Sequence, residues 1–209
     1  MSSRKLSWSR LVKGIDETPD WYREESIEVA FRKWLKKHKW GVFPRRKAQG
    51  DDIRAFDQKG ALWRFDVKGL PQLRTSEGVA KPQGSIKPKL HMGWLYALAE
   101  IVWRMKRKPG DYSRSALVFP DTENTQELAG YHYFQTLSLR MDQDIRSLLH
   151  LWIFLIDVSG SVKVLPPTGT KFVKWSSRFL PGKQDPEIKK YRRRLKLERV
   201  RLGIDSSLD

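Results

Sequence analysis

Two periodicities alternate along the chain and together predict an α/β fold. Apolar residues recur every three or four positions over residues 21–39 and 89–106, as in helices with one buried face. Shorter runs that are apolar throughout, or that alternate with polar residues, predict strands. In chain order we expect a helix, three strands, a helix, a strand, a helix and a strand that turns at Gly160 into a further strand, which indicates a central mixed β-sheet flanked by helices. The expected strands are 42–44, the two arms of a hairpin within 50–69, then 115–120, 151–158 and 162–165.

The hairpin within residues 50–69 has polar residues at one end. Gly60 follows two polar residues and marks the turn, and the segments on both sides are short, apolar and aromatic. Side chains alternate between the two faces of a strand. The second strand therefore places Ala61, Trp63, Phe65 and Val67 on one face and Arg64, Asp66 and Lys68 on the other. An antiparallel partner strand can bring Asp52 opposite Asp66 and Lys68.

Two carboxylates and a lysine at the end of a strand point to chemistry on phosphate. Asp52 and Asp66 offer the oxygen ligands that a hard divalent cation such as Mg²⁺ prefers. Such a cation activates water and stabilises charge on a phosphate under attack, and Lys68 can hold that water or offset the charge. The simpler alternative is a solvated strand face with a weak Asp–Lys ion pair.

An acidic residue, a hairpin and then Asp66-Val67-Lys68 resemble the signature of the PD-(D/E)xK nuclease superfamily, the restriction-endonuclease-like fold. The proline of that signature is absent, and Asp51 precedes Asp52 instead. The resemblance implies hydrolysis of phosphodiester bonds with Mg²⁺, replaceable by Mn²⁺, at Asp52 and Asp66, and with Lys68 supporting the water. Asp51 remains an alternative ligand, and Asp52 is preferred because the strand then begins directly after it, as in the family.

The first expected helix is a source of a third acidic group. In this superfamily a first helix commonly lends a glutamate to the metal site, and the spacing of Glu28 before the end of the helix is similar. Glu24 and Glu25 are rivals for this role. All three glutamates also suit the positive end of the helix dipole, so a purely structural role stays open.

The charge of the chain points to a polyanionic partner. Lys and Arg number 41 against 24 Asp and Glu, giving a formal net charge of +17, so nucleic acid is the first partner to expect. Cysteine is absent, which excludes disulfides and thiolate metal sites and fits a cytoplasmic location, nucleoid-associated in a bacterium. No apolar run is long enough to span a membrane, so no membrane partner is expected. The expected nucleic-acid contacts are Arg45, Arg46, Lys81, Lys87, Lys174, Arg193 and Arg194.

These patterns divide the chain into three segments. We expect an N-terminal arm at 1–19, a nuclease core at 20–167 and a basic, helical C-terminal extension at 168–209, whose charge would bind phosphates without reading sequence. The expected function is a Mg²⁺-dependent DNA endonuclease, with a homodimer plausible by analogy. One alternative is a catalytically silent or partner-dependent DNA-binding subunit of a defence, repair or transposition complex. Another is a basic module that binds RNA or DNA without metal. The sequence leaves the form of the substrate open.

Overall fold

The computed structural model describes residues 21–44, 52–71, 83–107, 114–123 and 133–180. The elements are α2 (Glu24–Lys37), β1 (Gly41–Val42), β2 (Ile53–Phe56), β3 (Leu62–Val67), α3 (Gln83–Arg107), β4 (Arg114–Pro120), α4 (Tyr133–Arg140), α5 (Gln143–Leu148), β5 (Leu151–Ile156), β6 (Val162–Leu165), β7 (Val173–Lys174) and a 3₁₀ helix (Ser177–Phe179). The strands form one seven-stranded sheet in chain order, β1 to β7. β3, β4 and β5 run parallel, and the remaining neighbours are antiparallel. The predicted α/β class with a central mixed sheet is therefore confirmed.

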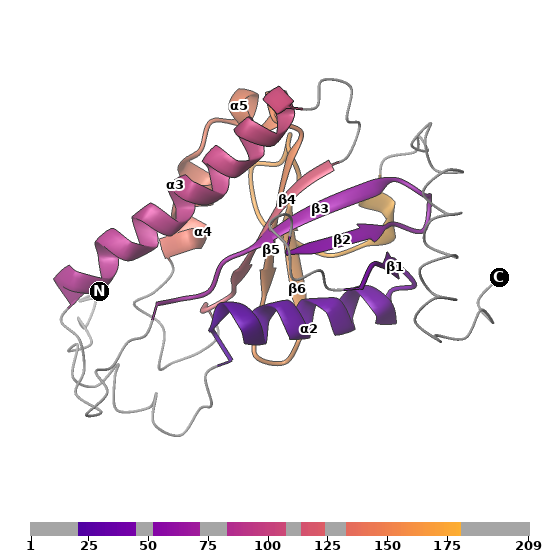
Figure 1. Ribbon diagram of the computed structural model, residues 1–209, viewed down its shortest axis with the longest axis horizontal. Coiled ribbons are helices and arrows are strands. Elements are labelled where there is room, and N and C mark those ends of the chain that lie inside the picture. Colours follow the sequence, from indigo (N-terminus) through magenta and orange to yellow (C-terminus); the bar gives the residue numbers. More distant parts are fainter. Residues whose placement is uncertain (1–20, 45–51, 72–82, 108–113, 124–132, 181–209) are drawn as a thin grey trace, which may run out of the picture.

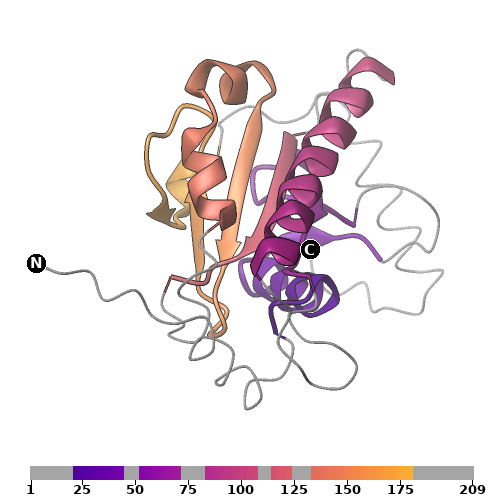
Figure 2. The same cartoon turned by 90° about the vertical axis from the view of Figure 1, so that its left-hand side faces the viewer.

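Helices cover both faces of this sheet. On one face α2 buries Phe31 completely, and its ring meets that of Phe65 edge to face. On the opposite face α3 places Trp94 against Phe119 of β4. Figures 1 and 2 show α2 on one side of the sheet and α3, α4 and α5 on the other. The sheet thus separates two apolar cores, one under α2 and one under α3.

The hairpin of β2 and β3 turns at Gly60, as predicted. Gly60 has a φ of +85°, a conformation that glycine adopts without strain. Asp57 organises the turn, because its carboxylate accepts hydrogen bonds from two backbone N–H groups and from the indole of Trp63. The predicted alternation is confirmed by the residues found in the core under α2, namely Ala61, Trp63, Phe65 and Val67. Asp66 lies alongside Leu117 of β4, which belongs to the core under α3.

The end of α2 differs from the prediction. The sequence favours a helix through residue 39 that Gly41 ends, but α2 ends at Lys37. Lys39 adopts the left-handed conformation, with a φ of +59°. The N–H of Trp40 then donates to the carbonyl of Leu35 at 3.0 Å, which closes the helix.

The start of α3 also differs. The sequence predicts a helix over residues 89–106, directly after Pro88, but α3 begins at Gln83 and includes this proline. Ile86 and Leu90 are both buried and extend the stripe that packs on the sheet. Burying two such side chains stabilises by about 1.5–3 kcal/mol each. That gain offsets the roughly 3 kcal/mol cost of a proline inside a helix.

The sheet continues past residue 167, where the sequence places the end of the core. β7 pairs with β6, and Trp175 and Leu180 pack into the core under α2. Residues 173–180 therefore belong to the sheet and its core. The predicted arm at 1–19 and residues 181–209 lie outside the described residues. So do residues 124–132, which include the start of a helix that the sequence predicts from about Thr125 to Met141. Across the described ranges, no helix combines the length and apolar character needed to cross a membrane.

Candidate active site

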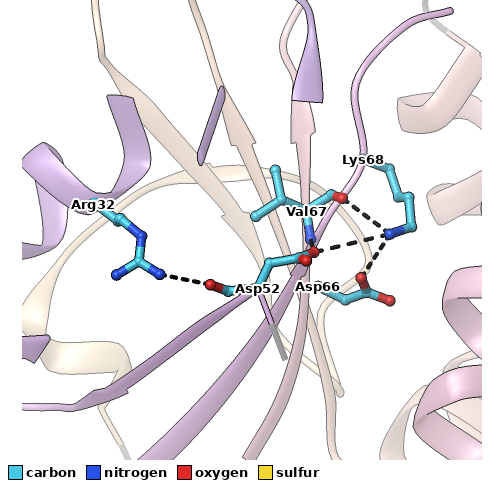
Figure 3. Close-up of polar contacts among 5 residues, drawn as sticks. All are labelled: Arg32, Asp52, Asp66, Val67 and Lys68. Carbon is cyan, nitrogen blue, oxygen red and sulfur yellow. Dashed lines mark hydrogen bonds and ion pairs between the residues drawn. The ribbon is translucent and has the colours of Figure 1, made fainter. Parts of the chain in front are cut away.

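Asp52, Asp66 and Lys68 meet at the carboxyl end of β3 (Figure 3). Nζ of Lys68 donates hydrogen bonds to Oδ1 of Asp66 at 2.7 Å and to the carbonyl oxygen of Val67 at 3.1 Å. The same nitrogen lies 3.9 Å from Oδ2 of Asp52. The side chain of Asp66 is 10% exposed and that of Lys68 is 23% exposed. The three residues identified from the sequence therefore lie together. Asp66 and Lys68 are more buried than an ion pair on a solvated strand face would be.

Asp52 is held in this group by the backbone of β3. The register of β2 and β3 begins with Ile53 opposite Phe65. Asp52 extends this pairing with its side chain, because Oδ2 accepts a hydrogen bond from the N–H of Val67 at 2.7 Å. The carboxylate of Asp52 is consequently fixed beside the last residues of β3.

Arg32 of α2 ties the helix to the main chain around Asp52. Its Nε donates to Oε1 of Glu28 at 2.8 Å, and one terminal nitrogen donates to the carbonyl of Phe43 at 2.9 Å. The other terminal nitrogen donates to the carbonyl of Asp52 at 2.6 Å, as Figure 3 shows. One planar guanidinium thus joins α2, the residue after β1 and the start of β2. Sequence reasoning missed Arg32, and the signal available was its position four residues after Glu28 on a helix.

Glu28 and Glu24 occupy different positions relative to the site. Glu28, preferred from the sequence, is buried and paired with Arg32. Glu24 lies one turn earlier and interacts electrostatically with Lys68 and Asp52. Glu24 is exposed as a whole residue, yet partial desolvation raises the pKa of its carboxyl, and Lys68 opposes that rise. Glu25 is exposed. Glu24 is therefore a helix glutamate whose charge is linked to both Asp52 and Lys68.

Gly69 explains how the start of α2 comes so close to β3. A Cβ atom at this position would lie 2.2 Å from the backbone nitrogen of Glu24 and 2.7 Å from the carbonyl oxygen of Tyr22. The N–H of Leu70 donates to that same carbonyl oxygen at 2.9 Å. Only glycine permits this approach of two backbones. The chain leaving β3 therefore packs closely against the start of α2 and is hydrogen-bonded to Tyr22, just before that helix.

The ionisation of the site follows from its burial and its like charges. Burial raises the pKa of Asp52 to about 6; Asp66 also raises it, whereas the N–H of Val67 and the charge of Lys68 lower it. Burial lowers the pKa of Lys68, but Asp66, Glu24 and Asp52 outweigh it, so the net change is upward. Lys68 is therefore a cation at neutral pH. It suits a donor to anionic oxygen, not a general base.

The donor set fits a divalent cation that also has non-protein ligands. Oδ2 of Asp66 is buried and has no hydrogen-bond partner among the described residues. A buried carboxylate oxygen of this kind is costly without a cation or donor. Within the described ranges, no group of three or more His, Cys, Asp or Glu side chains is arranged to hold a metal. The two carboxylates that could hold Mg²⁺ are those of Asp52 and Asp66, and an ion held by such a pair keeps other ligands such as water or phosphate.

The structure describes few of the expected nucleic-acid contacts. Lys174 is exposed on β7, the last strand of the sheet. Lys87 lies in α3, and its side chain is outside the described part of the chain. Asp51, the rival of Asp52, also lies outside the described residues. The same is true of Arg45, Arg46, Lys81, Arg193 and Arg194.

The described site can bind and polarise a phosphate group. Lys68 supplies a fixed positive charge, and two adjacent carboxylates supply ligands for a cation that phosphate would share. The net charge of the whole chain is +17, which favours polyanionic ligands in general. No protein-family model, curated protein or solved structure matches the chain.

Proposed function

We propose that this protein is a Mg²⁺-dependent DNA endonuclease of the PD-(D/E)xK type. The observation that carries the proposal is the meeting of Asp52, Asp66 and Lys68, with Lys68 held 2.7 Å from Asp66. The element order supports it, because α2, the antiparallel strands β1 to β3, α3 and the parallel strand β4 follow the order expected for that superfamily. The net charge of +17 favours DNA as the substrate.

In this mechanism Lys68 acts as a preorganised cation. Its Nζ is already held by Asp66 and by the carbonyl of Val67, so little further ordering is needed when substrate binds. Lys68 would donate a hydrogen bond to the attacking water or to a phosphate oxygen, and would offset the charge that grows as the phosphodiester bond breaks.

Asp52 and Asp66 are the proposed ligands of the cation. When bound there, Mg²⁺, or Mn²⁺ in its place, would lower the pKa of water and neutralise charge on the phosphate. The N–H of Val67 keeps Asp52 oriented toward this point. Glu24, whose charge is linked to Asp52 and Lys68, is the helix residue we propose to complete the polar group, in place of Glu28.

A second function is favoured by one observation. The described residues offer a pair of carboxylates but no group of three or more metal ligands. That arrangement also suits a DNA-binding subunit that does not cut alone, or that is completed by a partner in a defence, repair or transposition complex. Such a subunit would bind DNA in a salt-sensitive manner without needing metal.

The test is the nicking of supercoiled plasmid in Mg²⁺, Mn²⁺ or EDTA by the wild type and Lys68→Met. We expect wild-type cleavage to require metal and Lys68→Met to lower its rate by about 10²–10³-fold, the usual effect of losing one charge-stabilising donor. Binding of DNA in EDTA should persist. Lys33→Met is the matched control, because it removes the same charge from an exposed position on α2.

Each outcome separates the candidate functions. Cleavage that needs metal and Lys68, but not Lys33, supports the nuclease. Undiminished cleavage by Lys68→Met would show that the site lies elsewhere. Salt-sensitive binding by a wild type that never cuts would favour the DNA-binding subunit.

A further inference from the structure

α3 is apolar on two opposite sides. Its inner side packs on the sheet through the buried residues Ile86, Leu90, Trp94, Ala97 and Ile101. From Met92 to Trp103 the sequence contains one charged residue, Glu100. A helix that is apolar all round is typical of one covered on both sides. The outward side of α3 therefore needs an explanation that the fold of the sheet does not supply.

Large side chains stand exposed on this outward side. Tyr96 is 62% exposed and Val102 is 50% exposed. The residues on this side, here called the outer stripe, are Met92, Leu95, Tyr96, Ala99, Val102 and Trp103. Their spacing of three and four positions places them in one row along the helix, opposite the buried residues. In contrast, α2 exposes one large hydrophobic residue among those described, Val29.

The outer stripe has an approximate symmetry about Ala99. Leu95 and Tyr96 lie one turn before this small residue, and Val102 and Trp103 lie one turn after it. If two copies of α3 cross antiparallel at Ala99, each pair faces the other pair of the second copy. An interface around a two-fold axis requires this self-complementarity. A small residue at the crossing lets the helix axes approach to about 8 Å, the short end of the usual range.

We propose that the outer stripe is the contact surface of a symmetric dimer of this chain. The proposal does not depend on the cleavage chemistry, because the stripe faces away from the sheet that carries Asp66. Half-exposed side chains of this size present roughly 500 Å² per copy, and a standard stable interface buries about 800 Å² per partner. The dimer should therefore be weak and dependent on concentration.

The dependence on charge distinguishes a second copy of this chain from nucleic acid as the partner that binds the outer stripe. Each copy carries a net charge of +17, so two copies repel one another over a long range. The outer stripe itself contains no charged residue, so the contact does not oppose lysines directly. Salt should therefore strengthen the dimer by screening the repulsion, whereas salt would weaken the docking of a nucleic acid.

Sedimentation velocity of the full chain across roughly a hundredfold range of concentration tests the proposal. The wild type should shift from its monomer mass of 24.5 kDa toward twice that value, and further at higher salt. Val102→Glu should abolish the shift because it buries a carboxylate in the contact. Val29→Glu is the matched control, since Val29 is 51% exposed and Val102 is 50% exposed, both on helices. The control should dimerise like the wild type.

A cross-link tests the position of the axis without relying on a destabilising change. The chain has no cysteine, so Ala99→Cys introduces a single thiol. Close crossing at this position brings the two Cα atoms within the roughly 7 Å that a disulfide allows. Mild oxidation should link Ala99→Cys into a covalent dimer and leave Val29→Cys mainly monomeric.

Three results would overturn the proposal. The first is a wild type that stays monomeric over the whole range of concentration and salt. The second is a dimer that Val29→Glu disrupts as much as Val102→Glu does. The third is oxidation that links Val29→Cys as readily as Ala99→Cys, because that would reflect random collision.

Discussion

α2 and α3 cover opposite faces of the same sheet, but the two helices differ in the side chains that do not pack on it. α2 is amphipathic, and several of its polar side chains lie at the candidate site: Glu24 is linked to Lys68, and Arg32 binds the carbonyl of Asp52. α3 has an equally apolar inner face, yet its opposite side is the exposed outer stripe. The inner faces of the two helices explain folding. Their other faces point to chemistry in α2 and to association in α3.

The largest expected effect compares one aromatic residue from each helix. Phe31 of α2 is fully buried and stacks on Trp34 with ring centroids 5.3 Å apart. Phe31→Ala should lower the free energy of unfolding by about 3–5 kcal/mol, through lost burial and the cavity left behind. Tyr96→Ala, in the outer stripe, should change it by less than about 0.5 kcal/mol in dilute protein. Urea unfolding at low protein concentration measures both changes.

Concentration sharpens this first comparison. At high protein concentration the stability of the wild type should rise because association favours the folded state, and Tyr96→Ala should lose that increase. A large loss of stability for Tyr96→Ala in dilute protein would mean that the outer stripe is covered within one chain. The contrast between α2 and α3 would then fail.

The next effect concerns Arg32. Arg32→Met removes three hydrogen bonds, including the one to buried Glu28, and should destabilise by roughly 2–3 kcal/mol. At temperatures below the midpoint of its thermal unfolding, the variant should also cleave DNA more slowly than the wild type. The loss should be mainly in kcat, because the start of β2 is less firmly positioned. Plasmid nicking and thermal unfolding measure the two effects.

The control for Arg32→Met is Lys33→Met on the same helix. Lys33 is exposed, so its loss removes one positive charge without removing a buried partner. Arg32→Lys keeps the charge but not the planar fork, and should recover cleavage only in part. An Arg32→Met variant that is less stable but cleaves with normal kcat would make Arg32 purely structural.

The pattern of the sequence was sufficient for much of this structure because the decisive signals are local. Gly60 and the alternation around Trp63 predict the hairpin, and the same alternation separates Phe65 from Asp66. The meeting of Asp52, Asp66 and Lys68 followed because an antiparallel hairpin brings its two open ends together. These inferences require only the strand period and one turn.

Features that depend on distant contacts could not be predicted in this way. Arg32 is an ordinary helical residue until Phe43 and Asp52 fold back upon it. Glu24 is close to the site because the backbone at Gly69 packs against the start of α2. The turn of α3 before Pro88 forms because burial across the sheet outweighs a local helix breaker. In each case tertiary packing decides what local propensity leaves open.

The smallest expected effect is a dependence of stability on pH that the site has and the outer stripe lacks. Burial raises the pKa of Asp52 from its ordinary value of 3.8 to about 6, so folding favours the protonated carboxyl. Between these values the folded protein binds more protons than the unfolded chain, and stability in EDTA should rise as pH falls through 6. Asp52→Asn should reduce this slope. At neutral pH it should stabilise the protein by on the order of 1 kcal/mol, because solvent screens the charge of this partly exposed carboxyl.

Metal should reverse this dependence. Mg²⁺ prefers the ionised carboxylates, so it should stabilise the wild type more at about pH 8 than at about pH 5, and should stabilise Asp52→Asn less. Thermal unfolding of both proteins in EDTA and in Mg²⁺ provides the measurement. Tyr96→Ala in the outer stripe is the control, because it adds no carboxyl, and its response to pH and Mg²⁺ should match that of the wild type. If Mg²⁺ stabilised Asp52→Asn as much as the wild type, Asp52 would not be a metal ligand. If Asp52→Asn kept the full dependence of stability on pH in EDTA, another carboxyl would be responsible for it. Glu24 would then be the next residue to replace, because partial burial also raises the pKa of its carboxyl beside Lys68.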